Sequence, residues 1–147
     1  MPGTVAGVIV RPTSAIARVA CAVGLFALAA CTNTESPVNR TPLSGTATAS
    51  EVNGLQRITL LVGNDYRFHP STFYVHGGRV DVTLKNTGSG APHDFRVTKF
   101  PGDYVPFVQQ PGQTMSSTFT TPSPGRYQFV CTVHVRQGMV GTMVVTR

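Results

Sequence analysis

Near its C-terminus the chain reads Pro124-Gly-Arg-Tyr-Gln-Phe-Val-Cys131-Thr-Val-His134-Val-Arg-Gln-Gly-Met139-Val-Gly141. One apolar run ends at Cys131 and another begins after Met139, so residues 131–139 are expected to form a short loop between two strands. A loop of this length can direct the side chains of Cys131, His134 and Met139 toward one point. The stretch therefore predicts a metal site.

A further candidate donor, His93, lies in Pro92-His93-Asp94-Phe95, 38 residues before Cys131. One thiolate, two imidazoles and a thioether are the donors of a mononuclear blue-copper electron-transfer centre, in which the Met binds weakly along the axis. Taken singly, a Cys at a strand end or a Met near a C-terminal strand is an ordinary core residue. Taken together, His93, Cys131, His134 and Met139 predict a site for one copper ion.

The chain after residue 53 alternates between short β-rich runs and turn residues, without a helical period of useful length. Short strands at regular spacing predict an all-β sandwich. Residues 100–113 contain three Pro and two Gly and are expected to form a long connection between the sheets. About seven strands are expected, over Arg57–Val62, Thr72–His76, Arg79–Lys85 (with Val80, Val82 and Leu84 on one face), Phe95–Thr98, Met115–Thr121, Tyr127–Val130 and Thr142–Thr146.

The composition argues against a nucleic-acid partner. Only 12% of the residues are charged, and the net charge of +6 comes from Lys and Arg that are scattered singly along the chain. Nucleic-acid binding requires these charges to be clustered in a patch or stripe. We therefore expect no nucleic-acid partner.

Residues 1–30 have the features of a secretory signal peptide. Arg11 and Arg18 precede an apolar run of 12 residues that ends at Ala30, which is shorter than the ~20 residues of a transmembrane helix. The run ends in Leu28-Ala-Ala-Cys31, which resembles the lipobox of bacterial lipoproteins, and this resemblance implies that Cys31 is lipidated and becomes the first mature residue. A plain signal peptide or a buried N-terminal helix is the alternative.

Residues 31–53 are predicted to be the lipid-anchor cysteine and a flexible linker, and residues 54–147 the folded domain. Residues 32–53 contain eight Ser or Thr, two Pro and almost no large apolar side chain, so they cannot bury enough surface to offset their ordering entropy. With Cys21 removed and Cys31 acylated, Cys131 is left unpaired, which an oxidising compartment makes unusual unless the thiol binds a metal.

Residues from about 57 to 147 resemble a cupredoxin of the plastocyanin and azurin superfamily. The resemblance implies a Greek-key β-sandwich with copper at one end, apolar residues around it and His134 as the ligand nearest the surface. Plastocyanin-like members often have Asn after the upstream ligand, where this chain has Asp94. The matching pieces are Phe68–Pro70, Val75–Gly78, Asn86–Gly88, Pro92–Phe95 and Pro124–Gly141.

These features predict a monomeric one-electron carrier that is tethered by lipid to the membrane outside the cytoplasm and exchanges electrons with redox partner proteins. The alternative is a copper-binding protein for storage, delivery or resistance. Multicopper oxidases need a trinuclear cluster with many more histidines than the four in this chain, so an enzyme is not expected. His69 precedes a proline and His76 adjoins a turn, and neither is expected to bind metal.

Overall fold

The computed structural model describes Gly3, residues 42–100 and residues 104–147. Apart from Gly3, the expected signal peptide lies outside the described residues, and so does Cys31. Cleavage and lipidation therefore stay predictions. Within the described ranges, no helix has the length and apolar character needed to cross a membrane.

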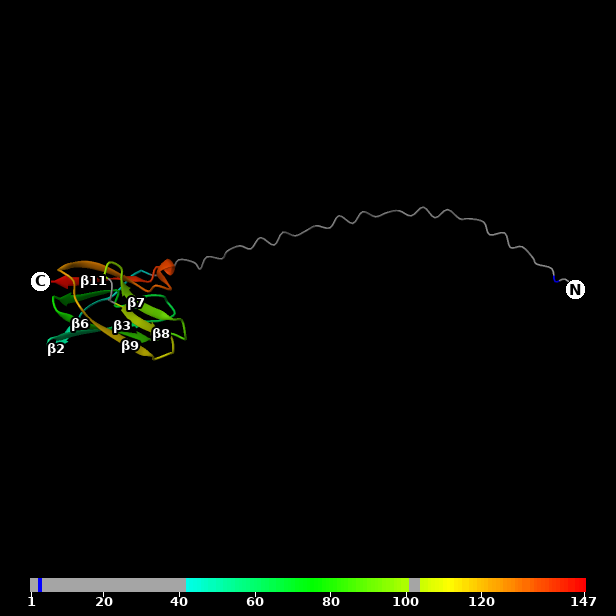
Figure 1. The fold of residues 1–147 in the computed structure, drawn as a ribbon, viewed down its shortest axis with the longest axis horizontal. Helices are drawn as coiled ribbons and strands as arrows, with labels where there is room; N and C mark the ends of the chain where they lie inside the picture. The colour runs from blue at the N-terminus through cyan, green and yellow to red at the C-terminus, as the bar shows by residue number, and fades with distance from the viewer. Residues whose placement is uncertain (1–2, 4–41, 101–103) are drawn as a thin grey trace, which may run out of the picture. The chain divides into compact units, whose positions relative to one another are not determined.

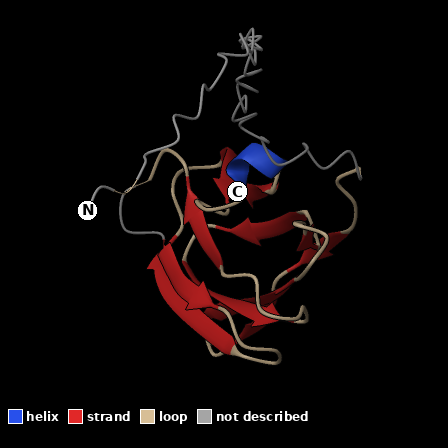
Figure 2. Cartoon of the chain, turned by 90° about the vertical axis from the view of Figure 1, so that its right-hand side faces the viewer, coloured by secondary structure: helices blue, strands red, loops and turns tan. Residues whose placement is uncertain are grey.

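Strands form two sheets, which confirms the predicted all-β sandwich (Figure 1). One sheet has the order β1-β5-β11-β10-β7-β8, and the other has the order β2-β3-β6-β9 with β4 paired to β3. A single 3-10 helical turn of the described residues, η1 (Val135–Gln137), is blue in Figure 2. The strands are β1 (Thr46–Thr48), β2 (Ser50–Val52), β3 (Leu55–Val62), β4 (Phe68–His69), β5 (Thr72–His76), β6 (Arg79–Asn86), β7 (His93–Val97), β8 (Tyr104–Val108), β9 (Thr114–Thr120), β10 (Gly125–Val130) and β11 (Val140–Thr146).

The core lies between the inner faces of the two sheets. On β6 the predicted face is confirmed, because Val80, Val82 and Leu84 are all fully buried. Four phenylalanines fill the centre, with ring centroids 4.9–6.5 Å apart in the pairs that touch, and each contributes about 1.5–3 kcal/mol through its burial. They are Phe68, Phe73, Phe95 and Phe129.

This aromatic core also fixes the direction of two candidate ligands. Successive side chains of a strand point to opposite faces, so residues two apart share a face. Phe95 lies two residues after His93, and Phe129 lies two residues before Cys131. Because both phenylalanines point inward, His93 and Cys131 point into the same end of the sandwich.

The structure has more strands than the seven predicted, and the extra strands are short. Residues 100–113 were expected to be a connection, but β8 lies within them and pairs with β7. Pro106 in the middle of β8 obscures the strand pattern. Proline is tolerated there because β8 is an edge strand, and on its outer side no neighbouring strand needs an N–H donor.

The predicted linker boundary at residue 53 was also wrong. β1 pairs in parallel with β5, and β2 pairs with β3 in a hairpin. Both are three-residue edge strands, and apart from Val52 their residues are small or polar, so their pairing depends on the neighbouring strand and leaves no apolar period in the sequence. The sandwich therefore begins by Thr46, and a fragment beginning at Gly54 would lack two of its strands.

Candidate metal centre

Three of the four predicted donors lie together at one end of the sandwich. One potential ligand atom from each of His93, Cys131 and His134 lies within 4.8 Å of the others. His93 and Cys131 are fully buried, and His134 is half-buried. This agrees with the expectation that His134 is the outermost of the three. That these residues bind metal stays a prediction.

Backbone hydrogen bonds close the loop that carries three of the candidate ligands. The amide of Cys131 donates to the carbonyl of Met139 (3.1 Å), and the amide of Met139 donates to the carbonyl of His134 (3.1 Å). Gly138 ends η1 with φ 81°, in the left-handed region that glycine adopts without steric cost. The spacing between Cys131, His134 and Met139 thus matches a compact loop between β10 and β11.

Met139 is brought to the cluster by its backbone. Its carbonyl and its amide bond to Cys131 and His134, as described above, and its side chain is fully buried within the hydrophobic core. A buried thioether at this position is consistent with the predicted axial ligand. The assignment of Met139 as that ligand remains a prediction.

Asp94 connects the upstream ligand strand to the loop. Its carboxylate, 1% exposed, accepts hydrogen bonds from the amide and the hydroxyl of Thr132, each at 2.6 Å. Charge-assisted hydrogen bonds of this kind are short and strong. Asp94 directly follows His93, and Thr132 directly follows Cys131. These two hydrogen bonds therefore fix the positions of His93 and Cys131 relative to each other.

The imidazole of His93 is suited to a bound metal ion. Both of its ring nitrogens are buried, and neither makes a hydrogen bond of good geometry, although the backbone of Gly63 lies near enough to act against the lowering of its pKa. An unpaired buried polar group costs about 1–3 kcal/mol, and such groups are rare in native proteins. His134 presents Nδ1 3.5 Å from the Sγ of Cys131. A thiolate with two imidazoles is a donor set that suits copper and zinc, so these residues fit a metal.

Burial shifts the pKa values of all three groups in the direction that favours their neutral forms. It lowers the pKa of His93 to about 4, with the nearby His134 acting in the same direction, and it lowers the pKa of His134. Burial raises the pKa of the Cys131 thiol to about 11. At neutral pH the metal-free protein therefore holds two neutral imidazoles, which are ready to bind, and one protonated thiol, which is not.

We expect Zn²⁺, used as a redox-inert probe, to release about one proton per ion from the metal-free protein at pH 7.5, because only the Cys131 thiol must lose a proton to bind. As the pH falls toward the lowered pKa values of the imidazoles, the histidines gain protons, so more protons are released and the affinity falls. Calorimetry in buffers of different ionisation enthalpy measures the number of protons released per zinc ion. Cys131→Ser should release none at pH 7.5, and full zinc binding by the wild type without proton release would exclude the thiol as a ligand.

Two residues near the cluster were not predicted. The Tyr66 ring lies 4.5 Å, between centroids, from the ring of His134 and 6.2 Å from that of His93. Tyr66 adopts φ 53°, which is a rare backbone conformation for an aromatic residue. Arg67, next to it, is buried and bonds to the ligand loop. In the sequence both residues belong to an ordinary polar loop, so no local pattern indicates them.

The other two histidines pair with carboxylates on the surface. His69 Nε2 lies 2.6 Å from Asp65 Oδ2, and His76 Nε2 lies 2.6 Å from Glu51 Oε2. Neither histidine belongs to the three-residue cluster found among the described residues. These contacts favour structural roles for both.

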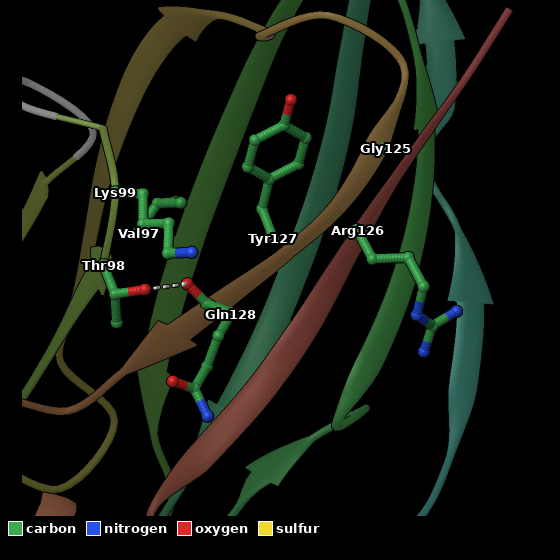
Figure 3. A pocket seen from close by; sticks show the side chains of 7 residues that line it. All are labelled: Val97, Thr98, Lys99, Gly125, Arg126, Tyr127 and Gln128. Atoms are coloured by element: carbon green, nitrogen blue, oxygen red, sulfur yellow. Dashed lines mark hydrogen bonds between the residues drawn. The ribbon is translucent and has the colours of Figure 1, made fainter.

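A pocket of about 460 Å³ lies along β7 and β10 and contains none of the predicted ligands. Figure 3 shows the Tyr127 ring within it and the hydrogen bond from the Thr98 hydroxyl to the Gln128 carbonyl (3.3 Å). Its lining residues on β10 are Gly125 to Gln128, whereas Cys131 follows the end of that strand. The pocket is therefore separate from the candidate metal centre.

A family model of the cupredoxin-like domain matches residues 20–145. The chain belongs to the cupredoxin-like family. This cupredoxin is 36% identical over 90 residues to a chloroplastic plastocyanin of Oryza sativa subsp. indica, and the match covers 53% of the chain and 54% of the relative. It is 35% identical over 102 residues to plastocyanin of Sambucus nigra, which covers 58% of the chain and 96% of the relative. The chain thus spans about half the length of the first of these curated relatives (54%) and nearly all of the second (96%).

Solved structures give the same fold. Reduced auracyanin from the photosynthetic bacterium Roseiflexus castenholzii superimposes with a TM-score of 0.53 at 25% identity, covering 62% of this cupredoxin and 97% of that chain. Auracyanin A from Chloroflexus aurantiacus, a "blue" copper protein, superimposes with a TM-score of 0.55 at 22% identity, covering 63% of this cupredoxin and 100% of that chain. The metal binding domain of the Cu(I) exporting P-type ATPase CopA of Streptococcus pneumoniae superimposes with a TM-score of 0.55 at 19% identity, covering 72% of this cupredoxin and 100% of that chain.

Proposed function

We propose that the protein is a blue copper protein that carries single electrons between redox partner proteins. The observation that carries the proposal is the buried cluster of Cys131, His93 and His134, with both nitrogens of His93 unpaired, in a chain of the cupredoxin-like family. The cofactor is one copper ion. As a cupredoxin, the protein is an electron carrier and not an enzyme.

In this proposal Cys131, His93 and His134 hold the metal, and Met139 is the weak axial ligand. Bound copper supplies a one-electron couple between Cu(I) and Cu(II). The residues around it keep the ligand positions the same in both states: the aromatic core fixes His93 and Cys131, and Asp94 and the backbone bonds fix the loop. Since little has to move, electron exchange requires little reorganisation.

The surface around His134 is the expected route for electrons. His134 is half-buried, and on the same loop Val133 and Val135 are 45% and 43% exposed. Exposed apolar side chains that are contiguous mark sites of protein contact. A partner that docks on these valines would lie close to His134 and could exchange electrons through its imidazole.

Copper storage or delivery is the second candidate, because the CopA metal binding domain has the same fold. That likeness is at 19% identity and concerns the fold alone. Proteins that hand over copper usually offer exposed Met and His. Here Met139 and Met143 are buried and only Met115 is exposed among the described methionines, which favours electron transfer.

Visible absorption and a redox titration of the copper-loaded protein test the proposal. An electron carrier should be intensely blue as Cu(II), cycle reversibly between its two oxidation states and retain its copper when a Cu(I) chelator is added. Colourless protein at full copper loading would exclude a blue-copper centre. Rapid loss of Cu(I) to the chelator would favour copper delivery.

The axial assignment predicts a change of potential without loss of metal. Met139→Gln should keep copper bound but lower the reduction potential, because a harder oxygen donor stabilises Cu(II) relative to Cu(I). Protein-film voltammetry measures the shift. The matched control is Met143→Gln, which alters a second buried methionine on the neighbouring strand β11. An unchanged potential in Met139→Gln would show that Met139 is not the axial ligand.

We further propose that Cys31 is lipidated and anchors the carrier to the membrane outside the cytoplasm. The support is the Leu28-Ala-Ala-Cys31 sequence at the end of an apolar run. Two or more acyl chains suffice for stable anchoring, whereas a single chain binds reversibly. Mass spectrometry of the mature N-terminus in the native host decides it, and an unmodified terminus at another residue would replace the anchored carrier with a diffusing one.

A further inference from the structure

Arg67 is a buried cation in the turn between β3 and β4. Its surface is 4% exposed, and the other arginines in the described ranges are all exposed. Arginine is almost never fully buried unless its donors are paired. The partners of Arg67 therefore indicate what its burial stabilises.

Its guanidinium reaches across the molecule to the ligand loop. Nη1 of Arg67 donates toward the carbonyls of Gln137 (3.2 Å) and Gly138 (3.0 Å), which are 70 and 71 residues away in the sequence. The last carbonyls of a helical turn have no partner within it. Arg67 satisfies the two carbonyls at the end of η1, directly before Met139.

The loop is thus held by a charged side chain at each end. Asp94 accepts two hydrogen bonds from Thr132, immediately after Cys131, and Arg67 donates to the residues immediately before Met139. Both charged side chains come from outside the loop. Ligands are most precisely placed when such supporting hydrogen bonds lock their positions.

The same nitrogen also holds Tyr66. Nη1 of Arg67 lies 2.9 Å from the Tyr66 carbonyl. Tyr66 needs this support, because its φ of 53° is a sparsely populated conformation that persists only when the surroundings impose it. With its backbone fixed, the Tyr66 ring packs against the ring of His134, tilted by 36°. One guanidinium therefore contacts the backbone next to Met139 and the backbone of the residue that packs on His134.

We propose that Arg67 is a positioning residue of the metal centre, which holds the Gln137–Met139 arm of the loop in place before any metal binds. Its effect on the copper couple rests on the proposed function, but its effect on the loop does not. Reduction lowers the charge of the centre by one, and a nearby buried cation favours the less positive state. Arg67 should therefore raise the reduction potential as well as order the loop.

The test compares Arg67→Met, which removes the charge and the donors, with Arg57→Met, which makes the same change at an exposed position of β3. In the metal-free proteins, amide hydrogen exchange of residues 134–140 should be faster in Arg67→Met by roughly tenfold. Exchange of β6 should stay as in the wild type, and Arg57→Met should leave both segments unchanged. With copper bound, the reduction potential of Arg67→Met should be lower than that of Arg57→Met.

Unchanged exchange of the loop in Arg67→Met would overturn the proposal, and so would an equal increase through both sheets, which would show general destabilisation. If Arg67→Met does not fold, Arg67→Lys is judged by the same exchange criterion, because lysine keeps the charge but lacks the planar fork of donors. A wild type that binds no copper as a blue centre would refute the proposed function. The exchange measurement on metal-free protein would still decide the role of Arg67.

Discussion

Cys131→Ser is expected to abolish the intense visible absorption of the copper-loaded protein while leaving the fold intact. The colour of a blue-copper centre requires the thiolate–copper bond, and the chain has no other cysteine in its described residues. A serine hydroxyl in the same place is a hard and weakly acidic donor that does not replace it. Because the substitution is nearly isosteric, the β-sandwich should persist, and absorption and circular dichroism of the same sample measure both effects.

Met143→Leu is the matched control for this experiment. Met143 is a fully buried sulfur-containing residue of β11, and replacement by leucine nearly conserves its volume, so the cost should be below about 1.5 kcal/mol. The variant should remain blue. A Cys131→Ser protein that kept the colour, or a Met143→Leu protein that lost it, would show that the wrong sulfur has been assigned.

Among the described glycines, Gly141 is expected to be the one whose replacement by alanine destabilises the domain most. Gly141 lies on β11, where it pairs with Phe129 of β10. A Cβ built at Gly141 would overlap the ring of Phe129 and lie 2.7 Å from the backbone carbonyl oxygen of Ser71. Neither can withdraw easily, because the ring is fully buried and the carbonyl accepts a hydrogen bond from the amide of Thr142 (2.8 Å).

Overpacking of this kind costs about 1–3 kcal/mol and sometimes more. For a domain of this size we expect the free energy of unfolding to fall by about 3 kcal/mol, with a decrease of roughly 15 °C in Tm. Thermal unfolding of the metal-free protein measures it. Gly77→Ala is the control, because a Cβ at Gly77 meets nothing within 4 Å. Equal Tm values for the two variants would show that β10 and β11 are not packed as described.

The parts of the fold that follow from the sequence are those in which a local period matches the burial. Val80, Val82 and Leu84 alternate with polar residues, and this alternation identifies an inward face without any knowledge of the partner strand. The spacing of Cys131 and His134 likewise predicts their convergence, because both belong to one short loop. His93 could be added because a candidate copper site needs a second imidazole.

The parts that could not be predicted depend on contacts between distant residues. β1 and β2 have only three residues each, all small or polar apart from Val52, and they form strands because β5 and β3 offer unpaired edges. Arg67 in the sequence is indistinguishable from the exposed arginines, and its role depends on carbonyls 70 and 71 residues away. The backbone conformation of Tyr66 is set by its surroundings and not by its residue type.

The placement of the short strands has a consequence for self-association. A sheet edge with free N–H and C=O groups can template the addition of a strand from another molecule, which leads to aggregation. In this protein β1 covers the edge of β5 and β2 covers the edge of β3, and each exposes only three residues. At the far edge of the first sheet, β8 carries Pro106, which cannot donate to a ladder. These three edges therefore oppose the strand-by-strand addition of further copies, which the proposed carrier needs if its His134 end is to stay accessible.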